Sequence, residues 1–537
     1  MTQRHSIDSL AFRKGMVFGW GWFLDDDLPA ARCELDVPMK DGSTQRIRCV
    51  PGGMRDDLKS AFPGVGHAAS AGFIIRGHLR GPADETTFAR LICTLVNGET
   101  HVREVHGFPS RYVANWEARG RARWVGFRER WVSDGFGKAV SHQWGRVRNR
   151  WQRWLSYFDM AMAFRKRGHT IVVFDHAMGG GANRYCQDMI AGMLADSRPV
   201  ALVTFRLATL DYSLSLRWSD QRVEVVHEHL HALLRQFALA DISEVHINNL
   251  VSFADPLGVV RWARERKQGH GSGIVLHLHD YYAICPSWTL IDVGGKFCGL
   301  PALDVCRKCL PANTAHTLSL APEMEVEQWR QEWQGLLEMA DRIIGFSNAS
   351  VNILKTAYPM IDKSRITVQP HVVDAASLRQ AQPVFGEILV IGVIGHISAA
   401  KGALVLQQMA HLIKEESRPV RIVVLGTLEY HHVGDGIEVT GEYQGSRLPD
   451  LLEQHGVGVC MLPSVCAETF SYVTAEIMAM QMPLAVFGLG APAERARRYD
   501  RGLVISQIDA ETALDEIQSF ASRLSGKASA TTKRNGH

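Results

Sequence analysis

The pattern of hydrophobic and polar positions divides the chain into an all-β part and two α/β parts. Short strands separated by Gly, Pro and Asp are predicted over residues 8–108, which favours a sandwich or a small barrel. From residue 169, apolar runs such as TIVVFDH and GIVLHLHD are mostly followed by helical stretches, and the pattern starts again after Pro383 with EILVIGVIG. Such alternation is typical of parallel sheets with crossover helices. We therefore predict an α/β fold with two Rossmann-like domains that face each other across a cleft, preceded by a small all-β domain.

These patterns also set the expected domain boundaries. They predict a β-rich accessory module (1–108), a basic helical linker (109–168), an N-terminal Rossmann-like domain (169–382), a C-terminal Rossmann-like domain (383–523) and a disordered tail (524–537). For the accessory module two interpretations stay open. It is either a packing or solubility appendage, or a module that binds a glycan or docks a partner.

The linker has an unusual composition. Between Arg111 and Arg167 it holds fourteen Lys or Arg against four acidic residues, and six of the chain's thirteen tryptophans. Trp124, Phe127 and Trp131 share one helical face. Tryptophan and arginine together suit an anionic membrane surface. The alternative is a helix whose tryptophans pack on the next domain, and nothing else in the chain supports nucleic acid.

Overall composition adds few constraints. Of 537 residues, 46% are hydrophobic and 21% are charged, and the formal net charge is only +3, so whole-chain charge predicts no partner. The chain shows no apolar run of about 18 residues and no apolar leader. We therefore expect a cytoplasmic protein, peripheral on the inner membrane face if the linker binds lipid. Its ten cysteines are then expected to be thiols or metal ligands.

Three segments carry candidate chemistry for a phosphorylated ligand. FDHAMGGGANRY joins a strand to a helix through a glycine-rich turn around Gly180 and Gly181, which lets backbone approach a ligand closely. It is not the dinucleotide fingerprint, because Arg184 stands where the third glycine belongs. In VIGVIGHISAAKG, Lys401 follows a strand and can reach a diphosphate. In IVLHLHDYYAICP, His279 lies at a strand end that faces the expected cleft.

The segment PSVCAETFSYVTAE places two acids around the predicted start of a helix. Glu468 precedes the helix, which we expect to begin near Ser471, and Glu476 lies one to two turns inside it. The unpaired N–H groups of a helix start favour an anion. One carboxylate can then hold a sugar and the other a ribose, with a diphosphate between them. The alternative is two solvated acids.

Taken together, these segments resemble glycosyltransferase family 4, retaining enzymes of the GT-B fold. Glu468 and Glu476 fit the family's E-x7-E pattern, GHISAAKG resembles its phosphate loop, and HDYYAICP resembles its histidine-containing strand end. The similarity spans roughly residues 169–523 and implies that residues 169–382 form the acceptor domain and residues 383–523 the nucleotide-sugar donor domain. One position departs from the family, since His396 stands where an arginine is usual. This departure raises three alternatives: low activity, a different donor, or a substitute arginine nearby.

The resemblance implies a role for each matched residue. The candidate catalytic residues are His279, beside the reacting sugar, and Glu468, on the transferred sugar. The implied donor-binding residues are Gly180, Gly181, His396, Lys401, Thr469, Phe470, Ser471 and Glu476, the last on the nucleotide ribose. Members of the family usually need no catalytic metal, so no catalytic cofactor is expected beyond the nucleotide-diphosphate sugar itself.

The function implied is a retaining, metal-independent glycosyltransferase. It would move a sugar from a nucleotide sugar to a glycan or lipid-linked acceptor, in surface polysaccharide biosynthesis. Two alternatives stay open: a catalytically degenerate protein that binds nucleotide or glycan, and another GT-B enzyme such as a nucleotide-sugar epimerase.

A cluster of cysteines lies outside these motifs. The cysteine cluster comprises Cys285, Cys298, Cys306 and Cys309. Four thiolates at such close spacing can hold a structural zinc ion in a tetrahedral site. The alternative is a set of free thiols in a loop.

Overall fold

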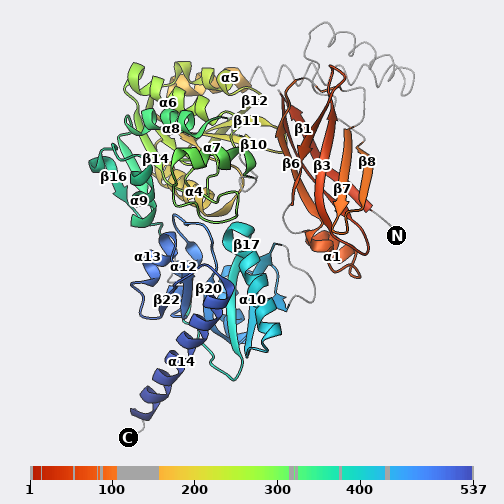
Figure 1. Cartoon of the computed structure of the whole chain (residues 1–537). Helices are drawn as coiled ribbons and strands as arrows, with labels where there is room; N and C mark the ends of the chain where they lie inside the picture. Colours follow the sequence, from red (N-terminus) through yellow and green to blue (C-terminus); the bar gives the residue numbers. More distant parts are fainter. Residues whose placement is uncertain are drawn as a thin grey trace.

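The computed structural model describes residues 4–534 except for positions 14, 52–54, 82, 85–88, 106–155, 314–319, 321–323, 374–377 and 430–435. The described chain forms a β-sandwich and two α/β domains (Figure 1). In that view the sandwich lies beside the first α/β domain, and the second α/β domain lies below it. This arrangement confirms the predicted fold class.

The N-terminal part is a sandwich of two antiparallel four-stranded sheets, ordered β1-β2-β6-β5 and β4-β3-β7-β8. Side chains of both sheets fill one buried core, including Phe23 and Phe73 from one sheet and Leu35 and Leu91 from the other. The elements are β1 (Arg4–Arg13), β2 (Met16–Leu24), β3 (Ala30–Pro38), β4 (Thr44–Arg48), β5 (Val50–Pro51), α1 (Asp56–Ala61), β6 (Gly72–His78), β7 (Ala89–Leu95) and β8 (Thr100–Val105).

The sandwich packs against the first α/β domain. Met16 and Phe18 belong to the buried cluster of that domain, and His78 Nε2 lies 3.3 Å from the carbonyl oxygen of Leu320. These contacts agree with the packing interpretation of the accessory module. A glycan-binding or docking role stays a prediction.

The first α/β domain is built on an eight-stranded sheet ordered β12-β11-β10-β9-β13-β14-β15-β16. Its strands run parallel except that β11 is antiparallel to both β10 and β12. The elements are β9 (Thr170–Phe174), α4 (Gly180–Ala195), β10 (Val200–Arg206), β11 (Asp211–Trp218), β12 (Gln221–His227), α5 (Leu230–Leu234), β13 (Ile242–Ile247), α6 (Pro256–His270), β14 (Gly273–His277), α7 (Leu303–Ala312), α8 (Val326–Leu337), β15 (Arg342–Gly345), α9 (Asn348–Ala357) and β16 (Ile366–Val368). The predicted parallel sheet is therefore mixed at this edge, where a β10-β11-β12 meander replaces a helical crossover.

The predicted linker lies mostly outside the described residues, and so do Trp124, Phe127 and Trp131. Its last part, residues 156–167, is helical. Met160 and Phe164 of this helix are buried in the core of the first α/β domain, with the Phe164 ring centroid 5.2 Å from that of Phe237. This end of the linker therefore packs on protein. In the part of the chain that the structure describes, no helix combines the length and apolarity needed to cross a bilayer.

The second α/β domain has a six-stranded parallel sheet ordered β19-β18-β17-β20-β21-β22. The elements are β17 (Leu389–Ile397), α10 (Ala403–Glu415), β18 (Val420–Leu428), β19 (Ile437–Val439), α11 (Leu448–Gln454), β20 (Val457–Leu462), α12 (Tyr472–Ala479), β21 (Leu484–Phe487), α13 (Gly490–Ala496), β22 (Gly502–Ile505) and α14 (Ala510–Arg534). Helix α14 extends into residues 524–537, where the sequence predicts a disordered tail, and points away from the body in Figure 1.

Strand order explains where a ligand site can form. In each α/β sheet the chain adds strands first on one side of its first parallel strand and then on the other. This reversal falls between β9 and β13 in the first domain and between β17 and β20 in the second. Ligands of open α/β sheets bind where the carboxyl ends of such strands leave a crevice. The glycine-rich turn follows β9, the Lys401 loop follows β17, and the Glu468 loop follows β20. The predicted motifs thus share these reversal points.

Candidate functional site: the cleft between the two α/β domains

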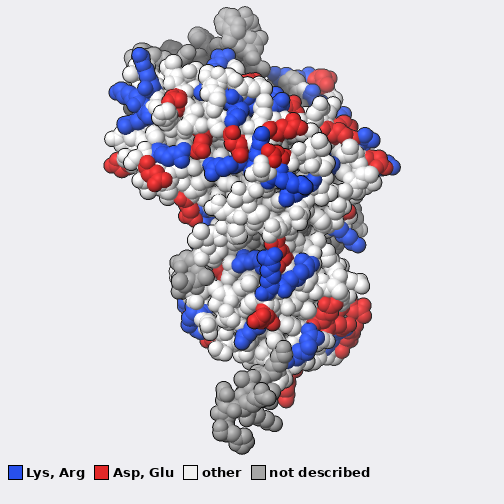
Figure 2. Space-filling model, turned by 90° about the vertical axis from the view of Figure 1, so that its left-hand side faces the viewer, with Lys and Arg blue, Asp and Glu red and all other residues white. Residues whose placement is uncertain are grey.

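A cavity of about 290 Å³ lies between the two α/β domains. The candidate site residues that line it are Gly181, His279, Lys401, Glu468, Thr469 and Phe470. On the face shown in Figure 2, the molecule narrows between the two lobes, and the narrow part carries mostly uncharged residues. The structure therefore brings together motifs that lie up to 289 residues apart in the chain, from Gly181 to Phe470.

The Lys401 loop and the loop after β20 are packed directly against each other. Gly402 has a φ of +87°, and a Cβ at this position would lie 2.0 Å from the carbonyl oxygen of Pro463. The backbone N–H of Val465 donates to the Ala400 carbonyl oxygen at 3.1 Å. Only glycine fits this close approach in the left-handed region. The Lys-Gly pair in the sequence thus holds the lysine beside the loop that carries Glu468.

Glu468 is held at both its side chain and its backbone. Its carboxylate accepts a hydrogen bond from the Ser464 hydroxyl, and its carbonyl oxygen accepts one from the Ala491 N–H at 2.8 Å. The residue is partly exposed onto the cavity. The carboxylate is thus fixed at the cavity wall, where it can accept hydrogen bonds from sugar hydroxyls.

The start of α12 contributes to the cavity wall on the side of the second domain. Ser471 caps the helix, since its hydroxyl accepts from the Thr474 N–H at 3.3 Å, which confirms the predicted helix start. Thr469 donates its hydroxyl proton to the carbonyl oxygen of His279 at 2.7 Å. This hydrogen bond joins the two α/β domains within the cavity. Ser471 itself lines a smaller neighbouring pocket together with Lys401 and Glu468.

His279 is oriented by a chain of hydrogen bonds in the first domain. The Asn248 amide donates to Asp175 at 2.8 Å, so its oxygen, 2.9 Å from His279 Nε2, accepts from the Nε2–H. Burial lowers the pKa of His279 well below its usual value, so the ring is neutral. Its Nδ1 then remains an acceptor for a ligand hydroxyl. Asn248 and Asp175 carry no motif, and sequence reasoning missed both.

The glycine-rich turn reaches the second domain. Helix α4 begins at Gly180, three residues before the predicted start near Asn183. A Cβ on Gly181 would lie 2.9 Å from Tyr472 Cε2, so the two domains touch here. Gly180 does not line the cavity.

Two predicted donor-binding residues also lie outside the cavity lining. Glu476 is half-buried on α12. Burial raises its pKa above the usual value, and the nearby Arg184 offsets part of this rise. His396, at the end of β17, has its Nδ1 2.7 Å from the Thr427 hydroxyl and its Nε2 3.4 Å from Glu429. The ring of His396 is thus engaged with β18 and the residue after it.

Two arginines that the sequence did not single out for binding lie near the start of α12. The Arg184 guanidinium carbon lies 5.1 Å from the centroid of the Tyr472 ring, and that of Arg495 lies 5.4 Å from the centroid of Phe470. Arg495 Nη1 is also 3.5 Å from the Ser471 carbonyl oxygen. Both guanidinium groups therefore lie against aromatic rings of the segment that leads into α12.

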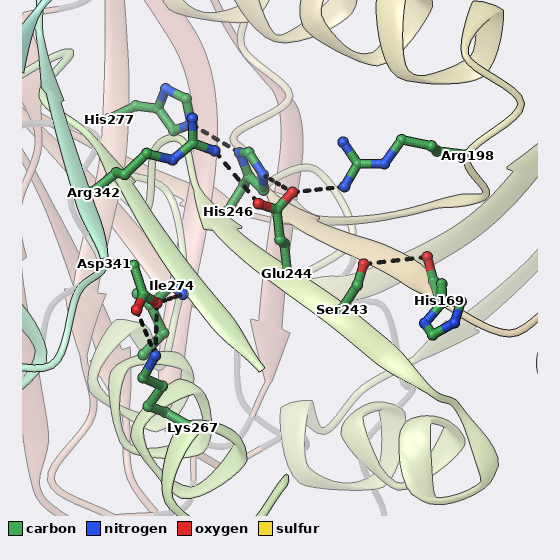
Figure 3. Close-up of polar contacts among 10 residues, drawn as sticks. All are labelled: His169, Arg198, Ser243, Glu244, His246, Lys267, Ile274, His277, Asp341 and Arg342. Atoms are coloured by element: carbon green, nitrogen blue, oxygen red, sulfur yellow. Dashed lines mark hydrogen bonds and ion pairs between the residues drawn. The ribbon is translucent and has the colours of Figure 1, made fainter. Parts of the chain in front are cut away.

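A polar network outside the cavity lining joins neighbouring strands of the first sheet (Figure 3). Glu244 accepts from Arg198 at 2.7 Å and lies 3.5 Å from His246 Nε2. The Nδ1 of His246 lies 3.0 Å from Nε2 of His277 on the adjacent strand. The His277 side chain is buried two residues before His279. The network therefore fixes the strand end that presents the candidate catalytic histidine.

All four residues of the cysteine cluster line a separate cavity of about 160 Å³. Among the described residues, no group of three or more His, Cys, Asp or Glu side chains is arranged to hold a metal ion. Burial raises the pKa of Cys285 to about 12, so this thiol is protonated without a metal. The structure brings the four thiols to one cavity, and the zinc ion stays a prediction.

Two α/β domains around a cleft, with the candidate residues at the carboxyl ends of their strands, define a protein of the GT-B class. Residues 388–523 match the family model described as Glycosyl transferases group 1. No curated protein matches the chain. The family match supports the predicted class of enzyme, a glycosyltransferase.

Several solved structures resemble the chain at low sequence identity. HepE of Anabaena in complex with UDP is 13% identical, covers 66% of this chain and 92% of its own, and gives a TM-score of 0.40. A glycosyltransferase from Rickettsia africae is 14% identical, with 66% and 89% coverage and a TM-score of 0.38. The pneumococcal O-GlcNAc transferase GtfA, in complex with UDP and GlcNAc, is 12% identical, with 59% and 57% coverage and a TM-score of 0.35.

Proposed function

We propose that this protein is a retaining glycosyltransferase that moves a sugar from a nucleotide-diphosphate sugar to a glycan or lipid-linked acceptor. The observation that carries the proposal is the convergence of Lys401, Glu468 and the start of α12 on one cavity whose opposite wall holds His279. A cation, a helix N-terminus and two hydrogen-bonding side chains match a diphosphate linked to a sugar.

Each residue has a separate task in this proposal. Lys401 and the N–H groups around Phe470 and Ser471 bind the diphosphate and stabilise the charge that develops on it as it leaves. Glu468 binds hydroxyls of the transferred sugar. His279, with a neutral ring, accepts a hydrogen bond from the same sugar. This electrostatic stabilisation assigns no step to a metal ion, in line with the family resemblance.

Glu476 is assigned to the nucleotide ribose, although it lies outside the cavity lining. It lies near enough to Arg184 of the other α/β domain for that guanidinium to lower its pKa against the effect of burial. A nucleotide that extends from the diphosphate along α12 brings its ribose hydroxyls towards this carboxylate.

A thermal-shift panel of UDP-, GDP- and ADP-sugars tests donor binding directly. A ligand at 100 times its Kd adds about 2.7 kcal/mol of apparent stability. One donor class should raise the Tm, and NMR of the product formed from it should show the donor's anomeric configuration. An inverted product would refute retention, and a panel without any shift would refute the donor site.

One observation favours a second candidate function, a nucleotide- or glycan-binding protein without transfer. His396 replaces an arginine and is engaged with Thr427 and Glu429. Transfer or hydrolysis of any nucleotide sugar by the purified protein would exclude it.

We base the proposed lipid-linked acceptor and the proposed membrane binding on the composition of the linker, residues 109–168, and on the family resemblance. Flotation of the full chain with vesicles that contain anionic lipid at low salt is the test. Vesicles of neutral lipid are the control, because arginine-driven binding needs anionic headgroups. Equal recovery with both kinds of vesicle would reject the membrane interpretation.

A further inference from the structure

His371 lies in the connection between β16 and β17 and lines the same cavity as Lys401 and Glu468. No motif marks it, and only 8% of its surface is exposed. Its Nδ1 is 2.6 Å from the hydroxyl of Tyr472, while its Nε2 is buried without a hydrogen-bond partner. A buried nitrogen without a partner at the wall of a cavity is unfavourable in the free protein, and a ligand atom can satisfy it.

Aromatic rings from both α/β domains fix the orientation of this histidine. Its ring stacks on Phe470, with centroids 4.4 Å apart and an interplanar angle of 7°. Phe346 and Tyr185 of the first domain lie with their centroids 4.2 Å and 4.8 Å from it. The ring therefore has little freedom to turn its Nε2 elsewhere.

The contacts also define which ring nitrogen of His371 carries the proton. Burial raises the pKa of Tyr472, so its hydroxyl keeps its proton and can donate to Nδ1 of His371. Burial lowers the pKa of His371 to about 4, so the ring is neutral near pH 7. A neutral ring that accepts at Nδ1 carries its proton on Nε2. His371 thus carries one uncharged, unpaired N–H donor, and it lines the same cavity as the cation of Lys401.

We infer that the Nε2–H of His371 donates a hydrogen bond to the terminal phosphate of the nucleoside diphosphate in the donor. The inference rests on the proposed function, because it assigns the diphosphate to this cavity. His371 then binds the donor from the segment that connects the two α/β domains, while Lys401 supplies the positive charge. Its stacking partner Phe470 precedes α12, so the histidine and the helix start approach the phosphate together.

Isothermal titration of the full chain with UDP, UMP, GDP, GMP, ADP and AMP tests the inference. For the nucleotide that the protein prefers, His371→Phe keeps a ring for stacking and should weaken the diphosphate about tenfold while leaving the monophosphate unchanged. His371→Gln places an amide N–H near the position of Nε2 and should retain much of the affinity. His411→Phe is the matched control, because His411 is an exposed residue of α10 that pairs with Glu415.

The outcomes separate this inference from the proposed function. If wild type binds none of the six nucleotides, the donor site itself is refuted together with the inference. If wild type binds a diphosphate and His371→Phe binds it equally well, or loses diphosphate and monophosphate alike, only the role of His371 is refuted. Circular dichroism and Tm show whether each variant is folded. If His371→Phe is not folded, His371→Gln decides the question: a loss of its selectivity for the diphosphate over the monophosphate would overturn the inference.

Discussion

The contact between Gly402 and Pro463 makes a sharp test of how the site is assembled. In Gly402→Ala, the new Cβ would lie 2.0 Å from the Pro463 carbonyl oxygen and 2.8 Å from its Cβ, at a φ of +87°. An L-residue in the left-handed region costs about 1–2 kcal/mol, and overpacking adds about 1–3 kcal/mol. We expect the free energy of unfolding to fall by about 2–5 kcal/mol.

Gly441→Ala separates the two contributions. Gly441 lies in the same domain with a φ of +84°, and a Cβ there would meet nothing within 4 Å. This variant should therefore carry only the left-handed cost. Urea unfolding of both variants, followed by tryptophan fluorescence, measures the difference that the collision causes.

The same substitution should also affect function. To relieve the collision, the Lys401 loop or the loop after β20 must move by about 1 Å, and a misplacement of this size can cost about a hundredfold in rate. Turnover of the preferred donor should therefore fall in Gly402→Ala and stay near wild type in Gly441→Ala. If the two variants agree within about 0.5 kcal/mol and in turnover, the close packing of the two loops is wrong.

Three further predictions concern individual groups. Glu476→Ala should weaken binding of the preferred nucleotide at least about tenfold with an unchanged Tm, measured by titration calorimetry; full affinity would remove Glu476 from the site. If the cysteine cluster binds zinc, the purified chain should contain about one zinc ion, measured by elemental analysis. A chain without zinc and with four titratable thiols in the cluster would refute the zinc site. Asp280 follows His279 and lines the cavity, and burial raises its pKa to about 7. The folded state therefore binds this proton more tightly than the unfolded state, so the free energy of unfolding should fall as pH rises from about 4 to 7. Asp280→Asn should flatten that fall by a few kcal/mol at most in urea titrations across this range, and an equal slope in both proteins would contradict the assignment.

Much of the fold could be predicted because its signals are local. Continuous apolar runs followed by helical periods predicted β9, β14, β17 and β20, and the switch from strand to helix at Ser471 predicted the start of α12. Strand β11 was missed, since DYSLSLRW carries no sign of which neighbour it pairs with. Strands β15, β16 and β22 are only three or four residues long, which is too short for a period to show.

The sequence by itself determined which residues can do chemistry and on which element each lies. A glycine after Lys401, a carboxylate before a helix start and a histidine just after a strand all follow from the order of residues along the chain. These features depend on neighbours in sequence, because backbone conformation and helix capping are local. The parallel winding then carried the motifs to the same edge of each sheet.

Only the tertiary structure decided which of these residues face the cavity. It placed Glu468 on the cavity wall and Glu476 outside it, engaged His396 with Thr427, and brought in His371 from a connection without any motif. It also made the hydrogen bond from Thr469 to His279, across 190 residues. The physical reason is that the direction of a side chain at a domain contact depends on how two separately folded sheets pack. Hydrophobic periodicity along one segment carries no information about that packing.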